Sequence, residues 1–120
     1  MNGPDGCIGH AELQIGDSVV MLADEFPGMN TSPSTLNGTT VSFLVYVKDV
    51  DTAFQKAVGL GAKAVFPPAD KFYGDRMGVV SDPFGHVWCL ATHVEDVPPQ
   101  EMARRAAAEA AKRAGKSPQT

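Results

Sequence analysis

A strand–helix–strand–strand–strand pattern over residues 40–92 constrains the fold of this chain more than any other feature of its sequence. Residues 40–48 are rich in β-branched and aromatic side chains, which favour a strand. Residues 50–58 carry apolar side chains at helical spacing, and Asp49 or Asp51 can cap the start of that helix. Three strands are predicted after the helix, between turn signals: residues 62–66, 76–81 and 86–92. This order of elements predicts an α+β fold.

A β-hairpin is predicted before this pattern. Residues 10–15 alternate polar and apolar side chains, Gly16-Asp17 forms a two-residue turn, and residues 18–23 return as a second strand. A two-residue turn fixes the register of the hairpin, because it sets Ile15 opposite Ser18. One face then carries Ala11, Leu13, Val20 and Leu22, and the other carries His10, Glu12, Gln14, Val19, Met21 and Ala23.

Two further segments complete the chain. Residues 25–39 contain repeated Pro, Gly and Asn turn signals and are predicted to be a linker. Residues 96–120 are a basic tail, in which residues 99–114 are rich in alanine and carry Glu–Arg pairs four residues apart. We expect a helix there whose alanine-rich face packs weakly.

The charge of the chain is unevenly distributed. The net charge is −4, but residues 1–95 carry eleven acidic residues against five Lys or Arg, whereas residues 96–120 carry a net charge of +2. An acidic body argues against nucleic acid as a partner, because binding to phosphates needs a basic face.

The sequence shows no feature of a membrane or exported protein. It contains no apolar run of about 18 residues, and its first residues lack the basic and apolar regions of a secretory signal. Cys7 and Cys89 lie far apart and in no metal-binding spacing. We therefore expect a cytoplasmic protein with reduced thiols and no membrane partner.

Several motifs together resemble the PhnB-like branch of the vicinal oxygen chelate (VOC) superfamily, which includes glyoxalase I, extradiol dioxygenases and the bleomycin resistance proteins. The motifs are Ile8-Gly9-His10-Ala11-Glu12-Leu13, Phe72-Tyr73-Gly74-Asp75-Arg76 and Asp82-Pro83-Phe84-Gly85-His86-Val87-Trp88. The resemblance implies two βαβββ modules that face each other around a cavity.

The resemblance predicts one domain over residues 1–95, followed by the helical tail of residues 96–120. Residues 40–92 match one complete module, and residues 1–24 match only the last part of the other. We expect that the missing opening strand and helix reflect a truncated version of a longer protein, or that a second chain supplies them. A homodimer is the expected assembly.

The resemblance also bears on metal binding. Metal-dependent members of the superfamily bind the ion through Glu and His side chains that face the cavity, and the corresponding positions here are Met21, Ser42 and Cys89. A thioether, a hydroxyl and a lone thiol do not make a site for Ni, Fe or Mn, which prefer imidazole and carboxylate. We expect no metal and no cofactor, with a divalent metal as the alternative.

Other polar residues are candidates for a site. His10 and Glu12 lie two residues apart on one strand face and are either an acid/base pair or part of a solvated polar face. Arg76 either clamps an anionic group or forms a salt bridge to Asp75 or Asp82. His93 follows the last predicted strand and could face the cavity or the solvent.

The sequence leaves three functions open. The first is metal-free binding of a small molecule in the cavity, with contacts from Met21, Ser42, Tyr46, Arg76 and Cys89. The second is a glyoxalase-like lyase or isomerase, or a dioxygenase, that uses a divalent metal or the His10–Glu12 pair. The third is a fragment without activity.

Overall fold

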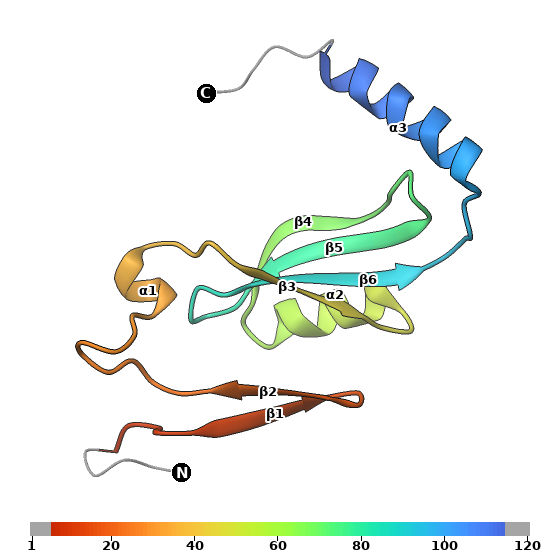
Figure 1. The fold of residues 1–120 in the computed structure, drawn as a ribbon. Coiled ribbons are helices and arrows are strands. Elements are labelled where there is room, and N and C mark those ends of the chain that lie inside the picture. Colours follow the sequence, from red (N-terminus) through yellow and green to blue (C-terminus); the bar gives the residue numbers. More distant parts are fainter. Residues whose placement is uncertain (1–5, 115–120) are drawn as a thin grey trace. The chain divides into compact units, whose positions relative to one another are not determined.

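The computed structural model describes residues 6–114, and the chain forms two compact units that divide between Gly38 and Thr39 (Figure 1). The first unit holds β1 (Ala11–Ile15), β2 (Ser18–Leu22) and α1 (Pro33–Leu36). The second holds β3 (Ser42–Tyr46), α2 (Val50–Gly59), β4 (Lys63–Asp70), β5 (Asp75–Ser81), β6 (Val87–His93) and α3 (Pro99–Ala114). None of the described helices is long and apolar enough to cross a membrane.

The hairpin of the first unit has the predicted register. Ile15 pairs with Ser18, Leu13 with Val20 and Ala11 with Leu22. The turn requires a positive φ at Gly16, which is 62°. Glycine adopts such an angle without strain because it has no Cβ. The prediction of β1 and β2 is confirmed.

The segment predicted as a linker contains a short helix, α1. Ser32 caps it, because its hydroxyl accepts a hydrogen bond from the Thr35 backbone N–H at 3.3 Å, and Pro33 is its first residue. Glu25 accepts hydrogen bonds from the Ser32 N–H and the Thr35 hydroxyl at 2.8 and 2.9 Å. A serine cap followed by proline is a typical helix start, so the sequence carried this signal.

The second unit has the predicted α+β architecture. Its four-stranded sheet has the order β3–β6–β5–β4, with β3 parallel to β6 and the other pairs antiparallel. A parallel pair needs a long crossover connection, and the chain passes through α2 and two further strands between β3 and β6. Asp49 caps α2 through the Thr52 backbone N–H, as expected.

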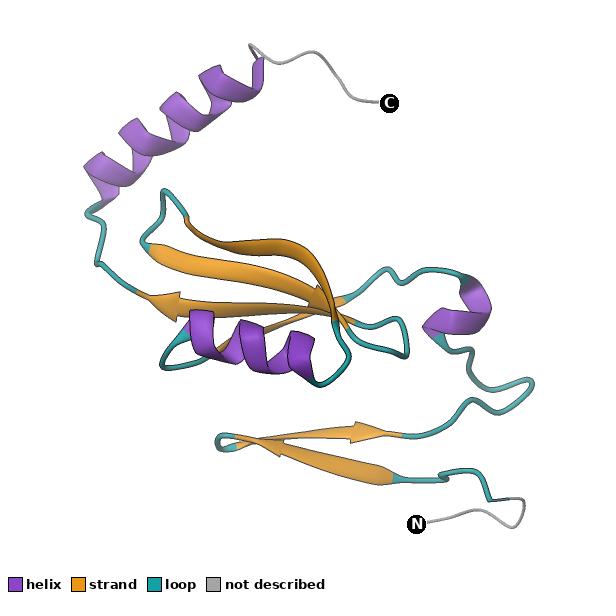
Figure 2. Ribbon diagram, turned by 180° about the vertical axis from the view of Figure 1, so that it is seen from behind, coloured by secondary structure: helices purple, strands orange, loops and turns teal. Residues whose placement is uncertain are grey.

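Helix α2 covers one face of this sheet (Figure 2). Its Val50 and Phe54 side chains are buried, and Phe54 lies against Gly78 of β5, where an added Cβ would stand 2.9 Å from the ring. Phe43 and Trp88 stack nearby, with ring centroids 4.7 Å apart. Most of the buried core therefore lies between α2 and the sheet, while Ala91, which is also buried, lies on the opposite face of the sheet beside Tyr46.

Strand β4 is longer than predicted. The expected strand ended before Pro67-Pro68, but β4 continues through both prolines to Asp70. Its pairing with β5 shifts register between Ala64 and Phe66 and again between Phe66 and Ala69. Proline has no backbone N–H group to donate to a neighbouring strand. Because β4 is an edge strand with irregular pairing, the two prolines cost the sheet few hydrogen bonds.

Candidate functional site

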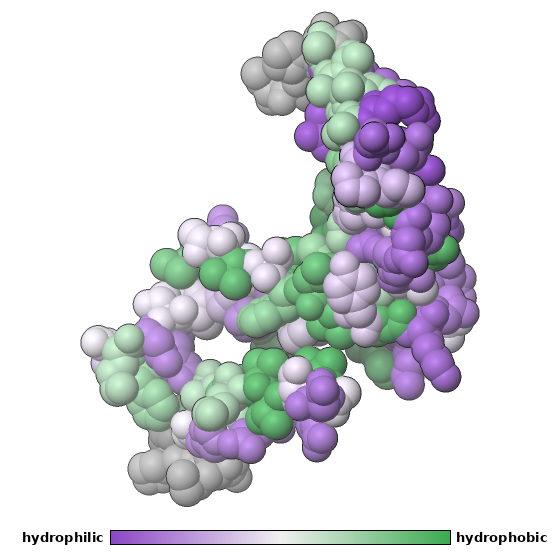
Figure 3. All heavy atoms as spheres, turned by 45° about the vertical axis from the view of Figure 1, so that its right-hand side comes forward, coloured by the Kyte–Doolittle hydropathy of each residue, from purple (hydrophilic) through white to green (hydrophobic). Residues whose placement is uncertain are grey.

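The sheet face opposite α2 presents apolar side chains to the surroundings. Pairing across β3, β6 and β5 places Leu44 beside Cys89, and Tyr46 beside Ala91. Leu44 is 55% exposed and Tyr46 is 59% exposed. Among the described helices of this unit only α2 packs on the sheet, and it lies on the other side. We call this surface, which carries Leu44, Tyr46, Cys89 and Ala91, the open face. Figure 3 shows that hydrophobic residues (green) reach the surface of the chain in several places.

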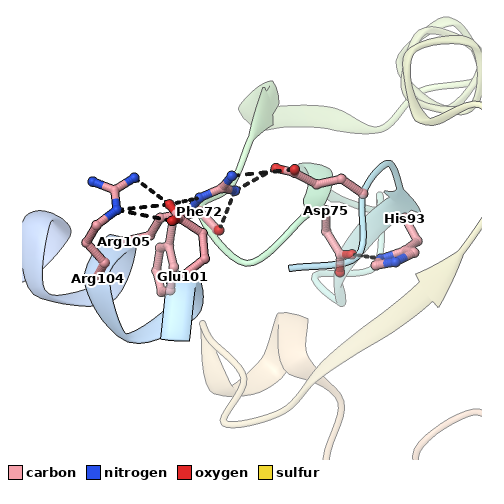
Figure 4. Close-up of polar contacts among 7 residues, drawn as sticks. Phe72, Asp75, His93, Glu101, Arg104 and Arg105 are labelled. Atoms are coloured by element: carbon pink, nitrogen blue, oxygen red, sulfur yellow. Dashed lines mark hydrogen bonds and ion pairs between the residues drawn. The ribbon is translucent and has the colours of Figure 1, made fainter. Parts of the chain in front are cut away.

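A polar cluster lies at one end of the open face. The carboxylate of Asp75, at the start of β5, pairs with His93 Nδ1 at 2.9 Å (Figure 4). The same carboxylate accepts a hydrogen bond from the Tyr46 hydroxyl at 2.7 Å. The other imidazole nitrogen, Nε2, lies 2.7 Å from Asp96. The Asp75 side chain is only 8% exposed, whereas His93 is half exposed. We call these residues the Tyr46–Asp75–His93 cluster.

The cluster sets the ionisation of its members. The hydrogen bond from His93, and then that from Tyr46, lower the pKa of Asp75. The contact with Asp75, and then that with Asp96, raise the pKa of His93. The hydrogen bond to Asp75 raises the pKa of Tyr46, so the phenol keeps its proton. The arrangement favours an imidazolium between two carboxylates, with a neutral phenol beside it.

Thermal stability is expected to fall as the pH rises above neutrality. Because the pKa of His93 is raised in the folded state, the protonated imidazole stabilises that state. This stabilisation is complete at pH values below 6.5, the ordinary pKa of histidine, and it is lost as the pH rises through the folded-state pKa. The ionised Asp75 carboxylate, whose pKa is lowered in the folded state, stabilises the protein at pH values above 3.8. That stabilisation is lost as the pH falls through the folded-state pKa of Asp75. Melting curves between about pH 5 and pH 9 test this. His93→Gln should flatten the alkaline decline, and an unchanged decline would contradict the assignment.

A tight corner holds the two strands of the cluster together. The Gly74 carbonyl accepts hydrogen bonds from the backbone N–H groups of Val94 and Glu95 at 2.9 and 3.1 Å. Gly74 has a φ of 98°, which only glycine adopts readily. The segment after β6 is thereby fixed against the start of β5, and His93 is held opposite Asp75. We call this contact the Gly74 corner.

The tail helix is attached beside this corner. Arg105 of α3 donates to the Phe72 carbonyl at 3.1 Å and pairs with Glu95 at 2.5 Å and Glu101 at 3.1 Å (Figure 4). The helix itself matches the predicted residues, and it buries none of its side chains. Its attachment to the rest of the unit is therefore polar.

The predicted contact residues of the second unit lie on both sides of the sheet. By strand pairing, Ser42, Tyr46 and Cys89 lie on the open face. Arg76 lies on the α2 side, where it forms two hydrogen bonds with Asp51 at 2.9 and 3.0 Å and one with Asp70 at 3.2 Å.

Arg76 thus forms a salt bridge, with partners other than the two that the sequence suggested. Asp75 belongs to the cluster on the opposite side. Asp82 accepts hydrogen bonds in its own turn, from the Trp88 indole at 3.0 Å and from the backbone N–H groups of Phe84 and His86 at 2.9 Å.

The remaining candidates lie in the hairpin unit. His10 Nε2 and Glu12 Oε2 are 2.9 Å apart, so the two residues of the predicted pair contact each other. Met21 pairs with Glu12 across the hairpin and is 70% exposed.

The donor set does not suit a divalent metal of the family's usual kind. Within residues 6–114 no group of three or more His, Cys, Asp or Glu is placed so that it could hold a metal ion. The positions that the resemblance assigns to ligands carry a thioether, a hydroxyl and a thiol, in Met21, Ser42 and Cys89. Such a set lacks the imidazole and carboxylate groups that Ni, Fe and Mn prefer.

Comparison with known proteins gives several relatives. The uncharacterized protein Rv0887c of Mycobacterium tuberculosis is 44% identical over 104 residues, which are 83% of this chain and 61% of that protein. The crystal structure of TioX from Micromonospora is 32% identical with a TM-score of 0.54, over 72% of this chain and 69% of that chain. The structure of the Arabidopsis thaliana gene product At5g48480 is 31% identical with a TM-score of 0.55, over 73% and 71% of the two chains.

A family model matches most of this chain, although the chain spans only 61% of the length of the Mycobacterium tuberculosis relative, which is less than two thirds. The match to the Glyoxalase/Bleomycin resistance protein/Dioxygenase superfamily covers residues 2–90, which include the hairpin and the sheet unit from β3 through the first part of β6. By this match and by the structural similarity, the chain belongs to the glyoxalase/bleomycin resistance protein/dioxygenase superfamily.

Proposed function

We propose that the chain binds a small molecule on the open face of its sheet and uses no resident divalent metal. The observation that carries the proposal is the open face itself, where Leu44 and Tyr46 are both more than half exposed beside an ordered polar cluster. Ligand sites combine apolar surface with a few oriented polar groups, and this face has both. The thioether, hydroxyl and thiol at the ligand positions support a metal-free site.

The wider setting of this function is part of the proposal. Within the superfamily we assign the chain to the PhnB-like branch, on the motifs around His10, Asp75 and Asp82. The reduced thiol of Cys89 agrees with a cytoplasmic location. A homodimer is the proposed assembly, since exposed apolar side chains favour association.

A neutral aromatic probe tests whether the open face binds ligands. We expect 2-naphthamide, titrated into labelled protein, to change the NMR signals of β3 and β6 residues on this face. Leu44→Gln should weaken binding about fivefold, because roughly 1 kcal/mol of apolar contact is lost. The matched control is Leu60→Gln, at a leucine that is 78% exposed and follows α2, and it should leave binding unchanged.

Two outcomes would contradict the proposal. Signal changes spread over the whole chain, or equal affinity of the Leu44→Gln variant, would show that the open face is not the site. Stoichiometric Ni, Zn or Fe in protein purified without chelators would instead favour a metal-dependent lyase or dioxygenase. In that case Cys89→Ser should also lower the metal content.

A further inference from the structure

We propose that His93 is the anchor for a carboxylate of the ligand, and that Asp96 occupies this place while no ligand is bound. The inference rests on the proposed function, because it concerns the same open face and names the class of molecule that it takes. That class is a monoanion with an apolar body and one carboxylate.

The first step is the fixed orientation of the imidazole. Its Nδ1 lies 2.9 Å from the Asp75 carboxylate, which is nearly buried and is also held by the Tyr46 hydroxyl at 2.7 Å. Asp75 and His93 are direct partners in the antiparallel pairing of β5 and β6. The ring cannot turn without breaking the contact with Asp75, so the direction of the Nε2–H bond is fixed by the sheet.

The second step is the contrast between the two carboxylates that flank the ring. Asp96 contacts Nε2 at 2.7 Å, but its side chain is fully exposed, and it lies between β6 and α3 in no regular element. An exposed ion pair of this kind contributes little free energy, because water replaces its hydrogen bonds readily. The outer carboxylate is therefore replaceable, whereas Asp75 is not.

The third step is the lack of a competing cation. On β3, β5 and β6, alternation places no other positively charged side chain on the open face. Arg76 is held on the α2 side by Asp51 and Asp70, and Arg105 is paired with Glu95 and Glu101. Lys63 pairs with Ser81, at the opposite end of β5. Among the side chains of these three strands, the cationic donor at this end of the open face is therefore the Nε2–H of His93.

The neighbouring groups also define the charge of the ligand. Asp75 and Asp96 both carry negative charge beside one imidazolium, so a dianion such as sulfate would meet stronger repulsion than a monoanion. A single carboxylate can replace the Asp96 carboxylate one for one, while Asp96 moves into water. The apolar part of the ligand then lies over Tyr46 and Leu44, which supply the remaining binding free energy.

The test compares a matched pair of probes, 2-naphthoate and its neutral analogue 2-naphthamide, by NMR titration at about pH 6, where the imidazolium is favoured. We expect 2-naphthoate to bind about tenfold more tightly than the amide and to shift the His93 ring signals. His93→Gln should abolish the preference while leaving amide binding in place. Asp96→Asn should increase the preference severalfold, because the internal competitor is weakened. His86→Gln, in the turn before β6, is the control and should change neither affinity.

The outcomes separate the two proposals. Equal binding of 2-naphthoate and 2-naphthamide would overturn the anchor and leave the open-face site standing, whereas binding of neither would overturn both. Inorganic sulfate, a dianion at this pH, would overturn the assignment to monoanions if it shifted the His93 signals as strongly as 2-naphthoate. Since Asp96 is fully exposed, the Asp96→Asn variant should fold, and an unchanged preference in it would show that Asp96 does not compete.

Discussion

Replacement of Gly74 by alanine is expected to lower the free energy of unfolding by about 3 kcal/mol or more. At the Gly74 corner φ is 98°, so any side chain is strained there. An added Cβ would also stand 2.2 Å from the Glu95 carbonyl oxygen and 3.1 Å from a Val97 methyl group. Because the nearest atom belongs to the backbone, relief requires the segment after β6 to move, and the two hydrogen bonds to the Gly74 carbonyl weaken with it.

Urea denaturation of the Gly74→Ala protein measures this loss. Gly59→Ala is the matched control, since Gly59 ends α2 with nothing within 4 Å of its added Cβ, and alanine there should be neutral or slightly stabilising. The pH dependence supplies a second readout, because displacement of the segment after β6 separates His93 from Asp75. A loss below about 1 kcal/mol with an unchanged alkaline decline would show that the corner adapts without strain.

Local signals in the sequence were enough to predict much of the fold. The register of β1 and β2 follows from a two-residue turn, and the start of α2 follows from a capping aspartate before an apolar helical pattern. These features depend on neighbours in sequence, so a single chain suffices to find them. The extension of β4 through Pro67-Pro68 depends instead on its edge position, which only the assembled sheet defines.

The candidate site was only partly accessible from the sequence. The turn after Ser81 sets Ser81 opposite Val87. Six residues back along β5 and six residues forward along β6, Asp75 lies opposite His93. That pairing could have been found from the hairpin alone. Tyr46 joins the cluster through the parallel pairing of β3 with β6, two strands that α2, β4 and β5 separate in the chain. No local pattern encodes that register, so the cluster as a whole emerges only from the tertiary structure.

Replacement of Phe54 by alanine is expected to cost about 3–5 kcal/mol, a large part of the total stability of a domain of this size. Phe54 is 8% exposed and is one of the few buried side chains between α2 and the sheet. Its ring lies where a Cβ on Gly78 would stand, at 2.9 Å from Cδ2, and Pro68 closes the same space at 3.2 Å. Alanine leaves a cavity in the layer between α2 and the sheet. Urea denaturation should show a lower midpoint, and Phe54→Leu should lose less because it fills more of the space.

The contact between Phe54 and Gly78 makes this prediction specific through a double-mutant cycle. Gly78→Ala alone should cost about 1–3 kcal/mol, because the new methyl group overlaps the Phe54 ring. In the Phe54→Ala protein the same methyl group enters the cavity, so the cost of Gly78→Ala should fall by about 1 kcal/mol or change sign. The double variant is therefore expected to be more stable than the sum of the single changes implies. Strict additivity would mean that the ring and the glycine do not share this space, and that α2 lies on the sheet in another way.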